Sequence, residues 1–196
     1  MTLHQKIIDH TRTFVALSER EALEFSGAFS EIKVKKRQFI IQPNFVAKHR
    51  YFVLQGALRA YVVGDEGSDH SIQLAIENWW ISDYNSYITQ QPASMFVVAM
   101  EDSLLAQISF EDEKRLKAAN YKYETYFRSI AERSTAFMQR RIISDLTQSA
   151  EERYTLFLEK YPLMADRFPQ YVIASYLGMT TEFLSKIRNR KVKRKS

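Results

Sequence analysis

The stretch PQYVIASYLGMTTEFLSKIRNR, residues 169–190, carries the strongest structural signal in the chain. Pro169 suits the first turn of a helix, where its missing N–H is not needed. The apolar face that follows consists of Val172, Ile173, Tyr176 and Leu177. Ala174 is small enough for a close helix crossing, and Gly178 can turn the chain with a positive φ. The stretch therefore predicts a helix, a short turn and a second helix.

The second helix is expected to begin after Thr180, which suits the N-cap. Its predicted apolar stripe is Phe183, Leu184 and Ile187. The candidate DNA-contacting residues of this helix and its cap are Thr180, Thr181, Glu182, Ser185, Lys186, Arg188, Asn189 and Arg190. Nearly all of these side chains can bond phosphates or base edges, so we interpret the unit as a DNA-binding helix-turn-helix. The alternative is an ordinary helical hairpin.

A basic segment overlaps the end of this unit. Seven of the 28 basic residues are Lys186, Arg188, Arg190, Lys191, Lys193, Arg194 and Lys195, with no acid among them. The rest of the chain has a slight acidic excess, although the whole chain carries a net charge of +5. A solvated tail would explain this charge equally well by itself. Next to a helix-turn-helix it favours binding of nucleic acid.

The first 30 residues predict two helices. Apolar residues recur at helical spacing over residues 3–15, and Ser18 with Glu21 three positions later matches a capping box. The helix after Ser18 carries Leu23, Phe25 and Phe29 on its predicted apolar positions.

From Glu31 to Ser109 the pattern changes to short runs rich in β-branched and aromatic residues. Turn formers separate several of these runs, and residues 60–75 with the turn GDEG predict a hairpin. Many short strands at close spacing indicate a sandwich or barrel.

Helical spacing returns at about Phe110. A heptad seam is formed by Asn120, Tyr123, Phe127, Ile130, Ser134 and Phe137. We expect it to be a dimerisation helix with Phe127 and Ile130 as anchors, although so short a seam is also consistent with packing on its own domain. A further helix is expected from Ser149, with Glu152 completing another capping box.

Composition argues against several classes of site. The chain has no cysteine, which excludes disulfides, thiolate zinc sites, iron–sulfur clusters and cysteine nucleophiles. Its four histidines are scattered, so neither a metal nor another cofactor is expected. Only His49 and His70 lie in the β-region, too few for a cupin-like enzyme, and we expect no enzymatic activity. No apolar run is long enough to span a bilayer and the N-terminus lacks a signal-peptide core, so a cytoplasmic protein without membrane contact is expected.

Three segments also resemble a known family. YFVLQGALRAYV (51–62), QRRI (139–142) and IASYLGMTTEFLSKIR (173–188) are similar to the Crp/Fnr transcription regulators, in the short form found in Bacteroidetes-like bacteria. The resemblance implies an α+β fold: a cyclic-nucleotide-binding-like double-stranded β-helix (jelly-roll) domain over 1–117, a dimerisation helix over 118–138, and a winged-helix-like helix-turn-helix domain over 139–196. QRRI would open the helix after the dimerisation helix.

The resemblance also implies partners and roles. The partners are double-stranded DNA, a second copy of the chain, RNA polymerase and a small-molecule effector of unknown identity. Thr181, Glu182 and Lys186 fall where the family's recognition helix reads the major groove. The family's wing hairpin is shortened here to LMADRFPQ, residues 163–170. The alternative function is a small-molecule-binding module that acts through protein contacts.

The ligand cassette of the family aligns with Ser82, Asp83 and Ser94, the candidate ligand-binding residues. Ala93 stands where the family has the arginine that pairs with a cyclic phosphate. The effector is therefore expected to be something other than cyclic AMP. Nearby aromatic residues are consistent with either a pocket or the core of the β-roll: Trp79, Trp80, Tyr84 and Tyr87.

Overall fold

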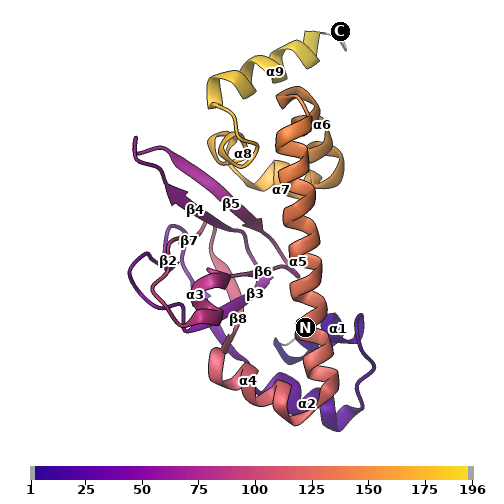
Figure 1. Ribbon diagram of the computed structural model, residues 1–196. Coiled ribbons are helices and arrows are strands. Elements are labelled where there is room, and N and C mark those ends of the chain that lie inside the picture. Colours follow the sequence, from indigo (N-terminus) through magenta and orange to yellow (C-terminus); the bar gives the residue numbers. More distant parts are fainter. Residues whose placement is uncertain (1–2, 194–196) are drawn as a thin grey trace.

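The computed structural model describes residues 3–193 and has the predicted α+β architecture, with a β-sandwich followed by helices (Figure 1). One sheet has the order β1-β8-β3-β6 and the other β2-β7-β4-β5, and all paired strands are antiparallel. The strands are β1 (Ser30–Val34), β2 (Phe39–Ile41), β3 (His49–Gln55), β4 (Leu58–Val63), β5 (Asp69–Ala75), β6 (Trp80–Ile81), β7 (Phe96–Ala99) and β8 (Ser103–Ser109). The short helix α3 (Tyr84–Thr89) lies between β6 and β7.

The predicted hairpin is confirmed as β4 and β5. Leu58 pairs with Ala75 and Val63 with Asp69, and Gly67 in the connecting turn has a φ of 76°. The inner side chains of the two sheets form one core; among its buried members are Val53, Leu58, Val97 and Leu105. Each strand is short, so the sandwich depends on this shared core rather than on any single strand pair.

The N-terminal helices α1 (Leu3–Arg12) and α2 (Glu19–Gly27) pack beside the sandwich and form a second core with β3, β8 and the long helix described next. The capping box of Ser18 and Glu21 at the start of α2 is confirmed. Leu23, expected on the apolar face of this helix, is instead 67% exposed. Ala22 and Phe25 are fully buried, and Leu23 follows Ala22 by 100° around the helix, which turns it to solvent.

Helix α4 (Phe110–Ala119) leads into α5 (Tyr121–Thr147), whose 27 residues span about 40 Å. Asn120 caps α5 rather than lying on its seam. Tyr123 is 0% and Phe127 1% exposed, because both pack in the chain's own second core. The prediction that Phe127 anchors a dimer is therefore wrong. The prediction that QRRI opens a new helix is also wrong, since residues 139–142 lie inside α5.

Four helices follow: α6 (Ala150–Lys160), α7 (Pro162–Arg167), α8 (Gln170–Tyr176) and α9 (Thr181–Lys193). The capping box of Ser149 and Glu152 is confirmed at the start of α6. Most of the LMADRFPQ segment belongs to helix α7, so it does not form the expected shortened hairpin. A third core joins these helices to the sandwich through Ala57, Leu74 and Ile76. Among residues 3–193, no helix is both long and apolar enough to cross a membrane.

Candidate nucleic-acid interface

Helices α8 and α9 occupy the predicted positions and are joined by a tight turn. Gly178 has a φ of +65°, a conformation that a side chain would strain. The Met179 amide donates to the Ala174 carbonyl at 3.0 Å, which closes the turn behind it. At the start of α9 the Phe183 amide donates to Thr180 Oγ1 at 3.2 Å, so the predicted N-cap is confirmed. The entry angle of α9 is thus fixed by local backbone geometry.

The buried face of α9 is narrower than the sequence pattern indicates. Leu184 and Ile187 are 1% and 2% exposed and pack in the third core. Phe183, predicted to share this stripe, is 44% exposed. Around the helix it lies 100° from Leu184 and about 40° from Ile187, which places it at the edge of the packed face. Leu184 and Ile187 therefore hold α9 on its neighbours, and most of the other side chains from Thr181 to Arg190 are exposed.

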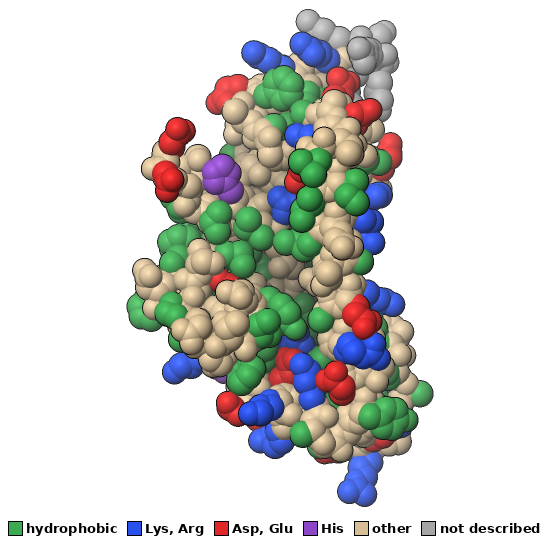
Figure 2. Space-filling model, in the orientation of Figure 1, with side chains coloured by type: hydrophobic (Ala, Val, Ile, Leu, Met, Phe, Trp, Pro, Cys, Tyr) green, Lys and Arg blue, Asp and Glu red, His purple; other side chains and the backbone are tan. Residues whose placement is uncertain are grey.

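The free face of α9 carries the candidate DNA-contacting residues. The exposed members are Thr181, Glu182, Lys186, Arg188, Asn189 and Arg190, while Ser185 is half-buried. Arg188 Nη1 donates to Gln170 Oε1 at 3.0 Å and so ties α9 to the start of α8. Figure 2 shows basic side chains at this end of the molecule, with acidic ones nearby and other basic side chains elsewhere on the same face. Of the predicted basic tail, Arg194 and Lys195 lie outside the described residues, and only the backbone of Lys191 and Lys193 is described.

Two arginines that the sequence analysis did not single out fix the end of α8. Arg141 of α5 donates to the carbonyls of Tyr176 and Ser71, both at 2.8 Å, and to that of Ile72. Arg153 of α6 donates to the Leu177 carbonyl at 3.1 Å. These charged donors satisfy carbonyls that a helix end leaves without partners. The turn between α8 and α9 is therefore attached to α5 and α6, and through Arg141 to β5.

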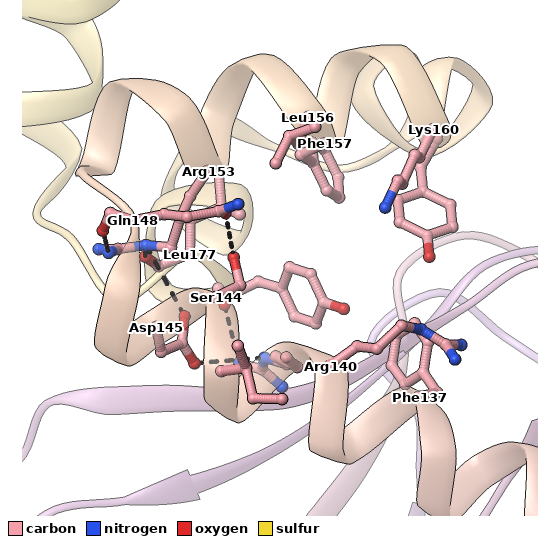
Figure 3. A pocket seen from close by; sticks show the side chains of 14 residues that line it. Phe137, Arg140, Ser144, Asp145, Gln148, Arg153, Leu156, Phe157, Lys160 and Leu177 are labelled. Atoms are coloured by element: carbon pink, nitrogen blue, oxygen red, sulfur yellow. Dashed lines mark hydrogen bonds and ion pairs between the residues drawn. The ribbon is translucent and has the colours of Figure 1, made fainter.

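These arginines border a cavity of about 290 Å³ between α5 and α6 (Figure 3). Arg153 also donates to the Gln148 carbonyl at 2.7 Å, and its Nε lies 3.7 Å from Asp145 Oδ1. Asp145 lies 3.9 Å from Arg141 as well. The charges of Arg141 and Arg153 are thus used to hold the helices together, which favours a structural role for these two residues.

A third attachment joins α8 to the β4–β5 hairpin. Ser175 Oγ accepts from the Ser71 amide at 2.9 Å and donates to the Asp69 carbonyl at 2.6 Å. Arg59, only 3% exposed, donates through Nε to Ser71 Oγ at 2.8 Å and pairs with Asp69 at 3.0 Å. An isolated arginine within the run ALRAYVV was the one sequence signal for this cluster, because a charge is rarely buried in a strand without a partner.

The structure brings two of the three candidate ligand-binding residues together. Asp83 is fully buried, and its Oδ2 accepts from the Ser94 amide at 2.8 Å and the Met95 amide at 3.1 Å. Ser82 points elsewhere and donates to the His49 carbonyl at 3.2 Å. The Asp83 carboxylate therefore occupies amides that an incoming anion would need, and it would repel that anion at close range.

Comparisons with known proteins agree with this architecture. Residues 31–120 match the family model of the cyclic nucleotide-binding domain. This segment covers β1 to β8 and α4. A search of curated protein sequences finds no match.

Solved structures share the fold over most of the chain at low identity. FixK2 from Bradyrhizobium japonicum superposes with a TM-score of 0.73 at 15% identity, covering 85% of both chains. CLP from Xanthomonas campestris, described as a c-di-GMP responsive global regulator, gives 0.71 at 12% identity, covering 90% of this chain and 93% of the other. The catabolite activator protein of Thermus thermophilus gives 0.56 at 17% identity, covering 92% and 86%. At these identities the likeness establishes the fold, and function must be argued from the site.

Proposed function

We propose that this chain is a DNA-binding transcription regulator of the Crp/Fnr type, in the short form seen in Bacteroidetes-like bacteria, with no enzymatic activity. The observation that carries the proposal is the division of α9 into two faces. Leu184 and Ile187 hold the helix on the domain, and between Thr181 and Arg190 the exposed side chains are polar or charged apart from Phe183 at the edge. A fixed helix whose exposed face carries Lys186, Arg188 and Arg190 suits the DNA major groove.

Three residues near the start of α9 are assigned to base recognition. Thr181, Glu182 and Lys186 lie on its first two turns and are exposed. A carboxylate accepts from the cytosine amino group, and an ammonium donates to guanine O6 or N7. Lys186 lacks the two-pronged geometry of arginine, so discrimination at its base pair is expected to be modest. The basic residues from Arg190 onward are assigned to phosphates, which carry no base identity.

Selection of bound sequences from random duplex DNA tests this function. The full chain should enrich one sequence motif, and its affinity should fall steeply as salt rises because phosphate contacts release counterions. A chain with Lys186→Ala should retain salt-dependent binding and lose preference at one base pair. Failure to enrich any motif, together with no binding at low salt, would leave the alternative of a ligand-binding module that acts through protein contacts.

The proposed active form is a homodimer that packs along the outer face of α5. Phe127 faces inward, but Met138, Ile142 and Leu146 recur every four residues and are 37%, 58% and 80% exposed. We expect a second copy of the chain to cover this stripe, because two-fold pairing of long helices buries such a seam. The same pairing places two recognition helices on the two halves of a pseudo-palindromic DNA site. Figure 1 shows the carboxyl end of α5 rising beside α6, toward the end that carries α9.

Sedimentation of the full chain tests the dimer. The wild-type chain should sediment as a dimer at micromolar concentration, and Ile142→Glu should shift it to monomer. The matched control is Thr147→Glu, which adds the same charge at an exposed position of the same helix, about 140° around it from Ile142 and outside the stripe. A wild-type monomer with and without DNA would contradict the dimer.

Cyclic AMP is not the proposed effector. Ala93 contributes no charge to the cassette, and the Asp83 carboxylate already holds the Ser94 and Met95 amides. Calorimetry with cyclic AMP and with cyclic GMP should show no saturable heat up to about 100 μM, which corresponds to roughly −5.5 kcal/mol of binding free energy. A micromolar dissociation constant for either nucleotide would contradict this part of the proposal. RNA polymerase remains a proposed partner of the DNA-bound dimer.

A further inference from the structure

A second cavity, of about 380 Å³, lies between β6 and the middle of α5. Its aromatic wall is formed by Phe14, Trp79, Trp80, Tyr84 and Phe137. The volume is in the range of small-molecule sites. Of the three candidate ligand-binding residues, Ser82 belongs to its lining, whereas Asp83 and Ser94 do not. The sequence analysis left these tryptophans open between pocket and core. Each is only partly buried, and both line this cavity.

Arg50 of β3 belongs to the lining, and its side chain is buried without a complete set of hydrogen-bond partners among the described residues. Its residue is 3% exposed, and its Nη2 is buried without a hydrogen-bond partner among residues 3–193. Its Nε lies 2.6 Å from Glu113 Oε2, an ion pair without hydrogen-bond alignment. The guanidinium centre lies 4.5 Å from the Trp80 ring and 4.7 Å from Phe127. A buried donor without a partner is costly, and an anionic ligand would supply the missing acceptor.

The charge around the cavity is strongly positive. Glu113 does not neutralise Arg50 fully, because its Oε1 also pairs with Lys117 at 2.6 Å. Arg133 and Arg140 of α5 line the cavity too, and neither forms an ion pair with any residue from 3 to 193. No aspartate or glutamate belongs to the described lining. The site therefore attracts anions and disfavours cations.

His10 adds a neutral ring to this wall. Burial and the nearby Arg133 charge lower the pKa of His10 to about 4, so it is uncharged at neutral pH. Its Nδ1 lies 2.9 Å from Tyr126 Oη, which accepts from Trp80 Nε1 at 3.1 Å. These contacts hold the Trp80 ring in the wall of the cavity.

We propose that this cavity binds a small organic carboxylate with a planar aromatic body. The carboxylate pairs with Arg50, and with Arg133 or Arg140 at the mouth, while the ring packs among the aromatic side chains. A cationic ligand would find no acidic side chain in the described lining, so it is disfavoured. A neutral ligand would leave Arg50 Nη2 without an ionic partner, so it should bind more weakly than a carboxylate. The assignment differs from a nucleotide site because no acidic group in the lining accepts from sugar hydroxyls.

Trp79 links this cavity to the helices that follow α5. The Trp79 ring contacts Phe137 of α5 at 5.7 Å between centroids and Tyr161, between α6 and α7, at 6.0 Å. A ligand ring placed against Trp79 therefore acts on the contact that positions α6 and α7. This regulatory consequence rests on the proposed function, whereas ligand binding itself does not.

Tryptophan fluorescence tests the site directly, because Trp79 and Trp80 are the only tryptophans of the chain. The full-length protein is titrated with naphthalene-2-carboxylate, and in parallel with naphthalene-2-carboxamide, which has the same shape without the charge. Saturable quenching by the carboxylate, with at least tenfold weaker quenching by the carboxamide, is expected. Equal affinity for both compounds, or no saturation by the carboxylate at millimolar concentration, would overturn the proposal.

Variants distinguish a loss of ligand binding from a loss of folding. Arg50→Lys keeps the charge beside Glu113 and removes the free Nη2, so carboxylate affinity should fall about tenfold while the circular dichroism spectrum stays unchanged. Arg140→Met should weaken binding severalfold without affecting folding, since Arg140 is exposed. Arg128→Met is the matched control on the same helix, because Arg128 pairs with Glu132 outside the lining. Loss of affinity in the control equal to that in Arg140→Met would contradict the site.

DNA binding is measured separately, by anisotropy of a labelled duplex with and without the carboxylate. A change in affinity of threefold or more supports the coupling through Trp79. Carboxylate binding without any DNA binding would overturn the proposed function and leave the ligand site intact. DNA binding that the carboxylate leaves unchanged would overturn the coupling alone.

Discussion

Replacing Arg141 by methionine should destabilise the attachment of α8 to the rest of the chain. The guanidinium donates to three backbone carbonyls, those of Ser71, Ile72 and Tyr176, and its side chain is 19% exposed. Methionine keeps much of the packing of the stem but leaves these carbonyls without their donor. A hydrogen bond to a charged group contributes about 1.5–3 kcal/mol, and water can reach part of the site, so we expect a loss of about 2–4 kcal/mol in the free energy of unfolding.

The assay is urea unfolding followed by tryptophan fluorescence. Arg140→Met is the matched control, because Arg140 is the neighbour on the same helix and forms no hydrogen bond or ion pair with any described residue. The control should change the free energy by less than about 0.5 kcal/mol. Amide exchange should also quicken around Gly178 and Met179 in Arg141→Met alone. Equal losses in the two variants would refute the role of Arg141.

Two further predictions concern single side chains that join a helix to the rest of the chain. Ser175→Ala should lower the free energy of unfolding in urea by about 1–2 kcal/mol, because the Ser71 amide loses its acceptor and the Asp69 carbonyl loses its donor. An unchanged unfolding midpoint would contradict this attachment of α8. Because the pKa of His10 is lowered to about 4 from 6.5, its contribution to stability is complete above pH 6.5 and is lost as the pH falls toward 4. Between these values the wild type should lose stability more steeply than His10→Gln, by up to about 1.4 kcal/mol per pH unit, and identical slopes would show that His10 is not buried as neutral imidazole.

The sequence predicted those elements whose signals are local. Both capping boxes, the β4–β5 hairpin and the turn at Gly178 depend on residues within a few positions of one another, and all are confirmed. The sandwich was predicted from strand spacing, and its sheet order was not, because strands from distant parts of the chain pair in it.

The sequence could not decide which side of α5 faces the domain. Tyr123 and Phe127 have the spacing of a dimer seam, but α1 and α2 cover them in the folded chain. Similarly, periodicity gave Phe183 the same weight as Leu184, although only the latter is buried. In both cases the outcome depends on tertiary contacts that a helical pattern does not encode.

The arginines were the largest omission. Arg59, Arg141 and Arg153 hold α8 and its turn through long-range bonds to backbone carbonyls and side chains, and Arg50 lies buried beside Glu113. In the sequence Arg59 is a single charge inside a strand, whereas Arg141 follows Arg140 and Arg153 follows Glu151 and Glu152. Their partners lie up to 116 residues away, as Arg59 and Ser175 do, so spacing alone does not reveal the pairs.

The central claim is that the free face of α9 reads base pairs, and Glu182→Ala tests it most directly. Binding is measured by fluorescence anisotropy to the selected duplex and to a scrambled duplex at several salt concentrations, with Glu159→Ala on the exposed face of α6 as the matched control. The account predicts that Glu182→Ala weakens binding to the selected duplex by about 1–3 kcal/mol and relaxes preference at one base pair. Binding to the scrambled duplex should become no weaker. The control should match the wild type. Equal change on both duplexes, or no change on either, would contradict the assignment of α9 as the recognition helix.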